Sequence, residues 1–194
     1  SHMLEIDLNS GLGEGYGPWK MGDDAAVMEV VTSANIACGG HAGDPATMYN
    51  SLVMAKQAGV SVGAHPGFAD REGFGRRRIP LTPLEIEHLI ASQVGASTGL
   101  ASLAGVSIGY VKPHGALANW AAEDERAAVP IVKAVKNAFP DMAILAISGT
   151  QLEQTAKQAG VRVYSEIFAD RGYCENGTLV PRSEPGALIT DPQE

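Results

Sequence analysis

Apolar runs of strand length alternate along the chain with longer amphipathic segments. The short runs are rich in Val, Ile, Leu and Ala, and helix-length segments separate most of them. Six strands are predicted, within residues 4–9, 33–38, 60–65, 108–113, 143–148 and 161–170. Alternation of this kind is typical of repeated strand-helix units whose strands form a parallel sheet. We therefore expect an α/β fold.

Helix signals between the strands support this interpretation. Asp44 before Pro45 is typical of a helix N-terminus, and Gly59 stands where that helix is expected to end. Thr82, with Glu85 three positions later, predicts a capping box at the start of a second helix. Two further helices are predicted, over 124–139 and 150–160.

Length and composition favour one globular domain. The chain has 194 residues, of which 45% are hydrophobic and 19% charged, and no linker-like segment divides it. We expect a single domain over residues 4–194, because residues 1–3 resemble the remnant of a purification tag. No apolar run approaches the about 20 residues that span a bilayer. A cytoplasmic location is expected.

The charge balance argues against nucleic acid or an anionic membrane as a partner. The chain carries 14 basic and 22 acidic residues, a formal net charge of -8. The one basic cluster, Arg76 to Arg78, is short and is interpreted as a solvated loop. The two cysteines form neither a disulfide framework nor a Cys-x-x-Cys motif, which suits a reducing compartment.

Residues whose side chains can bind ligands or take part in catalysis recur at the predicted strand ends. Parallel α/β folds bind ligands at the carboxyl ends of their strands. The residues found there are Asp7, Asn9, His41, Asp44, His65, Lys112, His114, Asp170 and Arg171. Three of the five histidines of the chain belong to this set, so we expect them to meet in one functional site.

Ordinary structural roles compete with this hypothesis. Asp44 suits a helix cap, and His65 and His114 each adjoin a proline, where a turn residue bonded to the backbone is expected. The glycine-rich segment 11–20 matches neither phosphate-loop spacing and is interpreted as a loop beside the site. Three histidines and several aspartates at successive strand ends are harder to explain by turns alone.

Five segments together resemble the LamB/YcsF family, whose members are known as the A subunit of the prokaryotic 5-oxoprolinase. They are "IDLNSGLGEGYGPW", "SANIACGGHAGDP", "VGAHPGFADREGFGRR", "VKPHGAL" and "FADRGYCENGTLVPRSEPGALI". The resemblance implies a distorted seven-stranded β/α barrel related to sugar deacetylases, incomplete here because the family's last segment is missing. It also implies ATP-dependent opening of 5-oxoproline to L-glutamate together with partner subunits B and C.

The chain departs from the family pattern at three positions. Gly11 stands where the family usually has Asp, Gly40 where it has Phe, and Ala118 where it has Tyr. Each departure removes a side chain near a strand end, so we expect the three to alter the pocket. Unpaired sheet edges in an incomplete barrel would favour a homo-oligomer.

The resemblance implies roles for the predicted site residues. Phosphorylation of the lactam oxygen makes it a good leaving group, and water then adds at the former carbonyl carbon. His41, His65 and His114 are the acid-base candidates, with Asp7 orienting one of them. The substrate-binding candidates are Lys112 and Arg171, which suit anionic groups, and Asn9, Asp44 and Asp170. ATP is expected to enter through the complex.

Two other functions stay open. Asp7, His41 and His65 resemble the Asp/His/His metal sites of the related deacetylases, in which a divalent ion activates water for amide hydrolysis. A third hypothesis is a non-catalytic docking subunit whose partners perform the chemistry.

Overall fold

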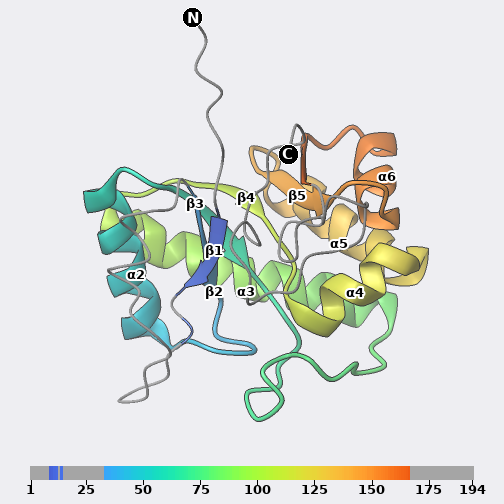
Figure 1. Cartoon of the computed structure of the whole chain (residues 1–194), viewed down its shortest axis with the longest axis horizontal. Coiled ribbons are helices and arrows are strands. Elements are labelled where there is room, and N and C mark those ends of the chain that lie inside the picture. Colours follow the sequence, from blue (N-terminus) through green and yellow to red (C-terminus); the bar gives the residue numbers. More distant parts are fainter. Residues whose placement is uncertain (1–8, 13, 15–32, 167–194) are drawn as a thin grey trace, which may run out of the picture.

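The computed structural model describes residues 9–12, 14 and 33–166. Its strands are β1 (Asn9–Leu12), β2 (Ser33–Ala37), β3 (Ser61–His65), β4 (Ile108–Val111), β5 (Ala143–Ile147) and β6 (Val163–Glu166). Its helices are α2 (Pro45–Ala58), α3 (Pro83–Ala104), α4 (Gly115–Glu123), α5 (Glu125–Ala138) and α6 (Gln151–Gln158). The predicted α/β class is confirmed (Figure 1).

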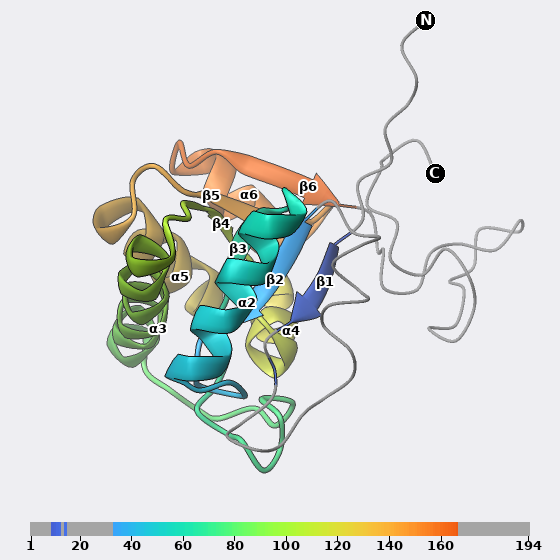
Figure 2. The ribbon, with the colours of Figure 1, turned by 90° about the vertical axis from the view of Figure 1, so that its left-hand side faces the viewer.

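The six described strands form one parallel sheet in the order β1-β2-β3-β4-β5-β6. Because neighbours in space are also neighbours in sequence, each right-handed connection runs in the same direction, and the helices pack on one face of the sheet. In Figure 2, α3 and α2 lie to the left of the strands β2 and β1. The carboxyl ends of the strands therefore gather at one edge.

A hydrophobic core fills the space between the sheet and the helices. Ile86, Ile90 and Val94 recur at intervals of four residues along α3, and each is 0% exposed. They belong to the same buried cluster as Ile131 and Val135 of α5. The long helix α3 thus anchors the segment that leads into it from the carboxyl end of β3.

The predicted helix ends are confirmed. The Thr82 hydroxyl accepts a hydrogen bond from the Glu85 backbone N–H at 3.2 Å, and the Glu85 carboxylate accepts one from the Thr82 N–H at 2.9 Å. The Asp44 carboxylate accepts from the Thr47 N–H at 2.9 Å, and Gly59 ends α2 with φ 69°. Caps of this kind satisfy backbone groups that a helix leaves unpaired at its ends.

The helix expected over 124–139 is confirmed as α5, but the sequence misses the helix α4 before it. Asp124 separates the two helices by accepting a hydrogen bond from the Arg126 N–H at 2.9 Å. The first strand, expected within residues 4–9, includes Asn9 and extends further than expected, to Leu12, because Asn9 to Leu12 pair with Ser33 to Ile36. Residues 4–8 lie outside the described residues.

No helix in the described part of the chain is long and apolar enough to cross a membrane.

Candidate metal centre

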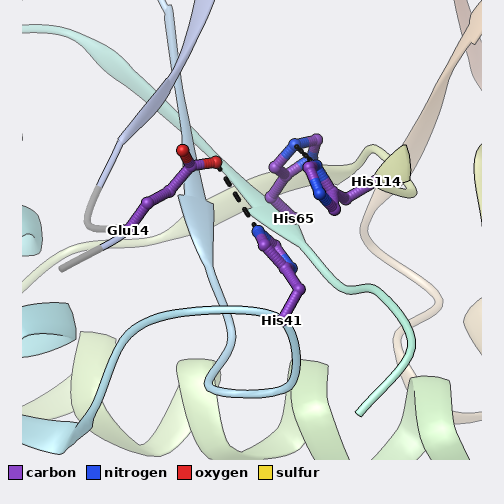
Figure 3. A group of neighbouring side chains, drawn as sticks. All are labelled: Glu14, His41, His65 and His114. Carbon is purple, nitrogen blue, oxygen red and sulfur yellow. Dashed lines mark hydrogen bonds and ion pairs between the residues drawn. The ribbon is translucent and has the colours of Figure 1, made fainter. Parts of the chain in front are cut away.

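Three histidines and one glutamate converge at the carboxyl edge of the sheet. His65 is the last residue of β3, His41 lies in the loop after β2, His114 directly precedes α4, and Glu14 follows β1. One potential ligand atom from each residue lies within 4.8 Å of all the others. Figure 3 shows the four side chains pointing toward one another. The predicted meeting of the three histidines is therefore found.

The histidine rings are buried and pack against one another. His41, His65 and His114 are 1%, 7% and 8% exposed. The rings of His41 and His114 stack with their centroids 3.7 Å apart, and His65 stands edge-on to both. Because the rings are buried, each ring nitrogen must find its hydrogen-bond partner within the protein. The partner it can have depends on whether that nitrogen carries a proton.

Backbone carbonyls fix the protonation of two rings. His65 Nδ1 lies 2.7 Å from the Lys112 carbonyl oxygen, and His114 Nε2 lies 2.7 Å from the Phe74 carbonyl oxygen. A carbonyl oxygen only accepts hydrogen bonds, so each of these nitrogens carries a proton. In the neutral rings, His65 Nε2 and His114 Nδ1 then bear lone pairs, and these two atoms are 3.1 Å apart.

The surroundings keep both rings neutral. Burial lowers the pKa of His65 well below its ordinary value, and the neighbouring His114 and His41 lower it further. The pKa of His114 is lowered to about 4, mainly by burial and secondly by the neighbouring His41. Near pH 7 neither ring has a second proton to place between the two lone pairs. A cation bound between these nitrogens would relieve their repulsion.

His41 is the third ring of the cluster, and it has no conventional partner. Among the described residues neither of its buried ring nitrogens has a hydrogen-bond partner, although Nε2 lies 3.5 Å from a carboxylate oxygen of Glu14. A buried polar atom without a partner calls for an explanation, and a metal ion supplies one.

The four side chains fit a divalent transition-metal ion. Three imidazoles and a carboxylate are a ligand set that zinc accepts, and tetrahedral ligands at 2.0 to 2.2 Å stand roughly 3.3 Å apart. The 3.1 Å between His65 Nε2 and His114 Nδ1 is close to that spacing. Metal-binding histidines also commonly donate their other N–H to a backbone carbonyl, as His65 and His114 do.

Among the described residues, Glu14 is the acidic member of the cluster. The sequence predicts Asp7 beside His41 and His65, and Asp7 lies outside the described residues. Sequence reasoning misses Glu14 because the glycine-rich segment around it matches no known phosphate loop. The signal for it is an acidic residue two positions after a strand end. Asp170 and Arg171 also lie outside the described residues.

The other predicted residues have different surroundings. Lys112 Nζ lies 3.0 Å from an oxygen of Glu166, whose side chain is 3% exposed. This ion pair borders a cavity lined by Ala118, Leu145, Ile147 and Leu152. The Asp44 carboxylate caps α2, with both oxygens accepting from Thr47, and Asn9 opens β1.

The three departures from the family pattern border these features. A Cβ at Gly11 would lie 2.8 Å from a Glu14 carboxylate oxygen and 3.8 Å from His65 Nε2, so a side chain there would enter the cluster. The amide of Gln93 occupies the space that a Cβ at Gly40 would need. Ala118 lines the cavity beside Lys112. Gly11 therefore borders the cluster, and Ala118 borders the cavity.

Fold and site together define a parallel α/β protein with a buried histidine-carboxylate cluster, suited to a metal ion, at the carboxyl ends of its strands. Comparison with known proteins identifies the group. The chain belongs to the LamB/YcsF family, whose sequence profile matches residues 6–194.

Similar proteins carry consistent names. The 5-oxoprolinase A subunit of Azorhizobium caulinodans is 54% identical over 191 residues, which cover 98% of this chain and 75% of that protein. The corresponding subunit of Rhodopseudomonas palustris CGA009 is 50% identical, with 98% and 76% covered. The crystal structure of the lactam utilization protein from Thermus thermophilus superimposes with a TM-score of 0.86 at 43% identity, over 97% of this chain and 76% of that one.

Proposed function

We propose that this chain is a subunit of an ATP-dependent 5-oxoprolinase and takes part in hydrolysis of the lactam of 5-oxoproline to L-glutamate, with partner subunits B and C. The names of the relatives support the substrate class. The observation that carries a catalytic rather than a docking role is the pair of facing lone pairs in a buried cluster of three histidines and a carboxylate.

The reaction sets clear chemical demands. Water adds to the lactam carbonyl carbon, the bond from that carbon to the ring nitrogen breaks, and the nitrogen takes up a proton as it becomes an amine. An unstrained lactam is a poor electrophile, so phosphorylation of its oxygen by ATP, with release of ADP, is proposed to precede the addition. Ring opening then leaves an acyl phosphate, and a second water releases its phosphoryl group as inorganic phosphate to give L-glutamate. We assign ATP to the complex, because the chain has neither phosphate-loop spacing.

Glu14, His41, His65 and His114 would hold a divalent ion. Such an ion, when bound, lowers the pKa of water and polarises a carbonyl oxygen. The Lys112 and Phe74 carbonyls hold His65 and His114 with their lone pairs turned into the cluster. Glu14 is the least buried of the four. One of its carboxylate oxygens would hold the ion, and the other is proposed to accept the proton that the attacking water loses.

Lys112 is proposed to bind the substrate's carboxylate. Its ammonium group borders a cavity whose other walls include Ala118 and Leu145, which suit the methylene groups of a five-membered ring. The Lys112 backbone carbonyl accepts a hydrogen bond from His65 of the cluster, so Lys112 lies between the cluster and this cavity. We further propose that the parallel sheet belongs to a seven-stranded β/α barrel, with Asp7, Asp170 and Arg171 near the same edge.

The test is glutamate formation from 5-oxoproline by the chain alone and with subunits B and C and ATP. We expect turnover only in the full mixture, and a loss on the order of 100-fold or more for His65→Gln. Arg126→Lys, far from the cluster on α5, serves as the control and is expected to keep full activity. Full activity of His65→Gln in the complex would support the docking role instead.

Metal analysis separates the proposed mechanism from one without a metal. Protein purified without chelators is expected to hold one divalent ion per chain, and His41→Ala and His65→Ala are expected to lose it. Amide hydrolysis by the metal-loaded chain without ATP or partners would favour the deacetylase-like alternative.

A further inference from the structure

A tight turn between β3 and α3 lies directly against the histidine cluster. In this turn Phe74 has φ 54°, and no other non-glycine residue in the described part of the chain has a positive φ. A bulky side chain makes that conformation unfavourable, so it persists only where the surroundings enforce it. Such strain near a candidate site raises the question of what it positions.

Phe74 contacts the cluster in two ways. Its carbonyl oxygen accepts the hydrogen bond from His114 Nε2 at 2.7 Å. Its ring stands edge-on to His41 and His114, with centroid distances of 5.2 Å and 5.0 Å. The backbone conformation of Phe74 therefore determines where the carbonyl meets His114.

An ion pair fastens the turn on both sides of Phe74. The Asp70 carboxylate is buried and accepts from Arg77 Nε at 3.0 Å, from Arg77 Nη2, and from the Gly73 N–H at 3.0 Å. The Asp70 carbonyl also accepts from the Gly75 N–H at 2.9 Å. The hydrogen bonds from Arg77 lower the pKa of the Asp70 carboxyl, which stays ionised.

The turn has little freedom to move away from the rings. Gly75 has φ 67°, and a Cβ there would lie 2.8 Å from the His41 Cβ and 3.0 Å from the His114 Cδ2. Only glycine allows this approach of the backbone to both rings. A shift of the turn would therefore move the histidines or open a gap beside them.

We propose that Asp70 and Arg77 are positioning residues: their ion pair holds Phe74 in its left-handed conformation, and the Phe74 carbonyl thereby holds the His114 ring with its Nδ1 facing His65. The run Arg76 to Arg78 is interpreted from the sequence as a solvated loop, and in this proposal one of its members, Arg77, has a positioning role. The consequence for metal binding rests on the proposed function, whereas the hydrogen bond from His114 exists without a metal and is measured separately.

Arg77→Lys tests the ion pair while keeping the charge, because lysine lacks the planar fork that contacts a carboxylate at two points. The readout is exchange with water of the His114 Nε2 proton, followed by NMR in chelator-treated protein. We expect exchange at least tenfold faster in the variant. The Arg77 side chain is 64% exposed, and lysine keeps a positive charge beside the buried Asp70, so the thermal midpoint should hardly change.

A matched control and a rescue make the test specific. Arg126→Lys breaks the corresponding contact of Arg126 with Asp124 at the start of α5 and should leave His114 exchange unchanged. Phe74→Gly keeps the carbonyl and adopts a positive φ without strain, so adding it to Arg77→Lys should restore slow exchange. Wild-type exchange in Arg77→Lys, or a folded double variant without rescue, would overturn the proposal.

Zinc affinity of the isolated chain adds a second readout. Loss of a group that orients a metal ligand commonly weakens metal binding 10- to 100-fold, so Arg77→Lys should weaken zinc binding by about tenfold. Calorimetry on the purified chain measures this directly. Absence of zinc binding in every variant, with the exchange results as expected, would contradict the proposed metal centre and still support the positioning role.

Discussion

At the scale of single residues, the site depends on which nitrogen of each imidazole carries a proton. The Lys112 and Phe74 carbonyls occupy one nitrogen each of His65 and His114, which leaves the other two nitrogens facing each other at 3.1 Å. Lowered pKa values keep the rings neutral, and a neutral ring is a ligand. The same features that make the metal-free cluster unfavourable suit it to a cation.

Acid should destabilise the metal-free protein through these rings. Unfolded histidine takes up a proton near pH 6.5, whereas folded His114 does so only near pH 4. The unfolded state binds more protons between these values, so the free energy of unfolding should fall as the pH drops through this window, by about 3 kcal/mol from His114 alone. Urea unfolding at several pH values measures the slope.

His114→Gln should reduce that pH dependence, because glutamine does not titrate, while His65 continues to contribute. His88→Gln, on the exposed side of α3, is the matched control and should leave the slope as in the wild type. An unchanged slope in His114→Gln would show that His114 is not the group responsible.

Gly11→Asp should strengthen metal binding. A Cβ at this position points at the cluster, 3.8 Å from His65 Nε2, and the flexible end of Glu14 is the atom group that must shift. A second carboxylate near the ion should lower the zinc dissociation constant about tenfold or more, which calorimetry measures. Gly99→Asp adds the same charge to α3, where a Cβ meets nothing within 4 Å, and should have no effect.

Residue chemistry could be predicted in part from the sequence. The histidines at strand ends were identifiable because strand ends in parallel sheets share one edge. Glu14 and Phe74 were not, because their contributions depend on where a loop side chain or a backbone carbonyl points, and no periodic pattern encodes that. The role of Asp44, in contrast, could be predicted, because the local Asp-Pro pair is enough to indicate a helix cap.

At the scale of elements, local signals explain most of the architecture. The capping box at Thr82 and the buried positions of α3 follow directly from spacing. Sequence reasoning misses the helix α4 because it begins with glycine directly after the His114 turn, a sequence that favours a loop. The bounds of β1 depend on its pairing with β2, which a single strand does not reveal.

The core of α3 should matter more for stability than its exposed side. Ile90 is fully buried, so Ile90→Ala should lower the free energy of unfolding by about 3 kcal/mol through lost burial and a cavity. Leu103 on the same helix is 76% exposed, and Leu103→Ala should change it by less than about 0.5 kcal/mol. Chemical denaturation of both variants checks this. Equal losses in the free energy of unfolding would show that Ile90 does not belong to the stabilising core.

At the scale of the whole molecule, the six described parallel strands, which follow one another in chain order, bring polar side chains from distant segments to one edge of the sheet. Glu14 and His114 are a hundred residues apart in sequence and meet there because β1 to β4 end side by side. The family relation extends over almost the whole chain, and the activity proposed for it belongs to a complex.

The isolated chain should not bind ATP tightly. Phosphoryl transfer requires organised cations around the triphosphate, and the arginines of the 70–78 segment already contact Asp70, Phe74 and Trp120. Calorimetry with ATP and magnesium should show no micromolar binding. Micromolar binding together with glutamate production by the chain alone would place the activating step in this protein rather than in its partners.

The central claim is that Glu14, His41, His65 and His114 together hold one divalent ion, and cobalt titration of chelator-treated protein tests it most directly. Cobalt(II) replaces zinc in sites of this kind, and its visible absorption reports the ligands and their geometry. We expect a band that rises linearly and stops at one equivalent per chain, and that is lost in His65→Ala but kept in Arg126→Lys. No saturable band, or the same band in His65→Ala, would contradict the metal centre.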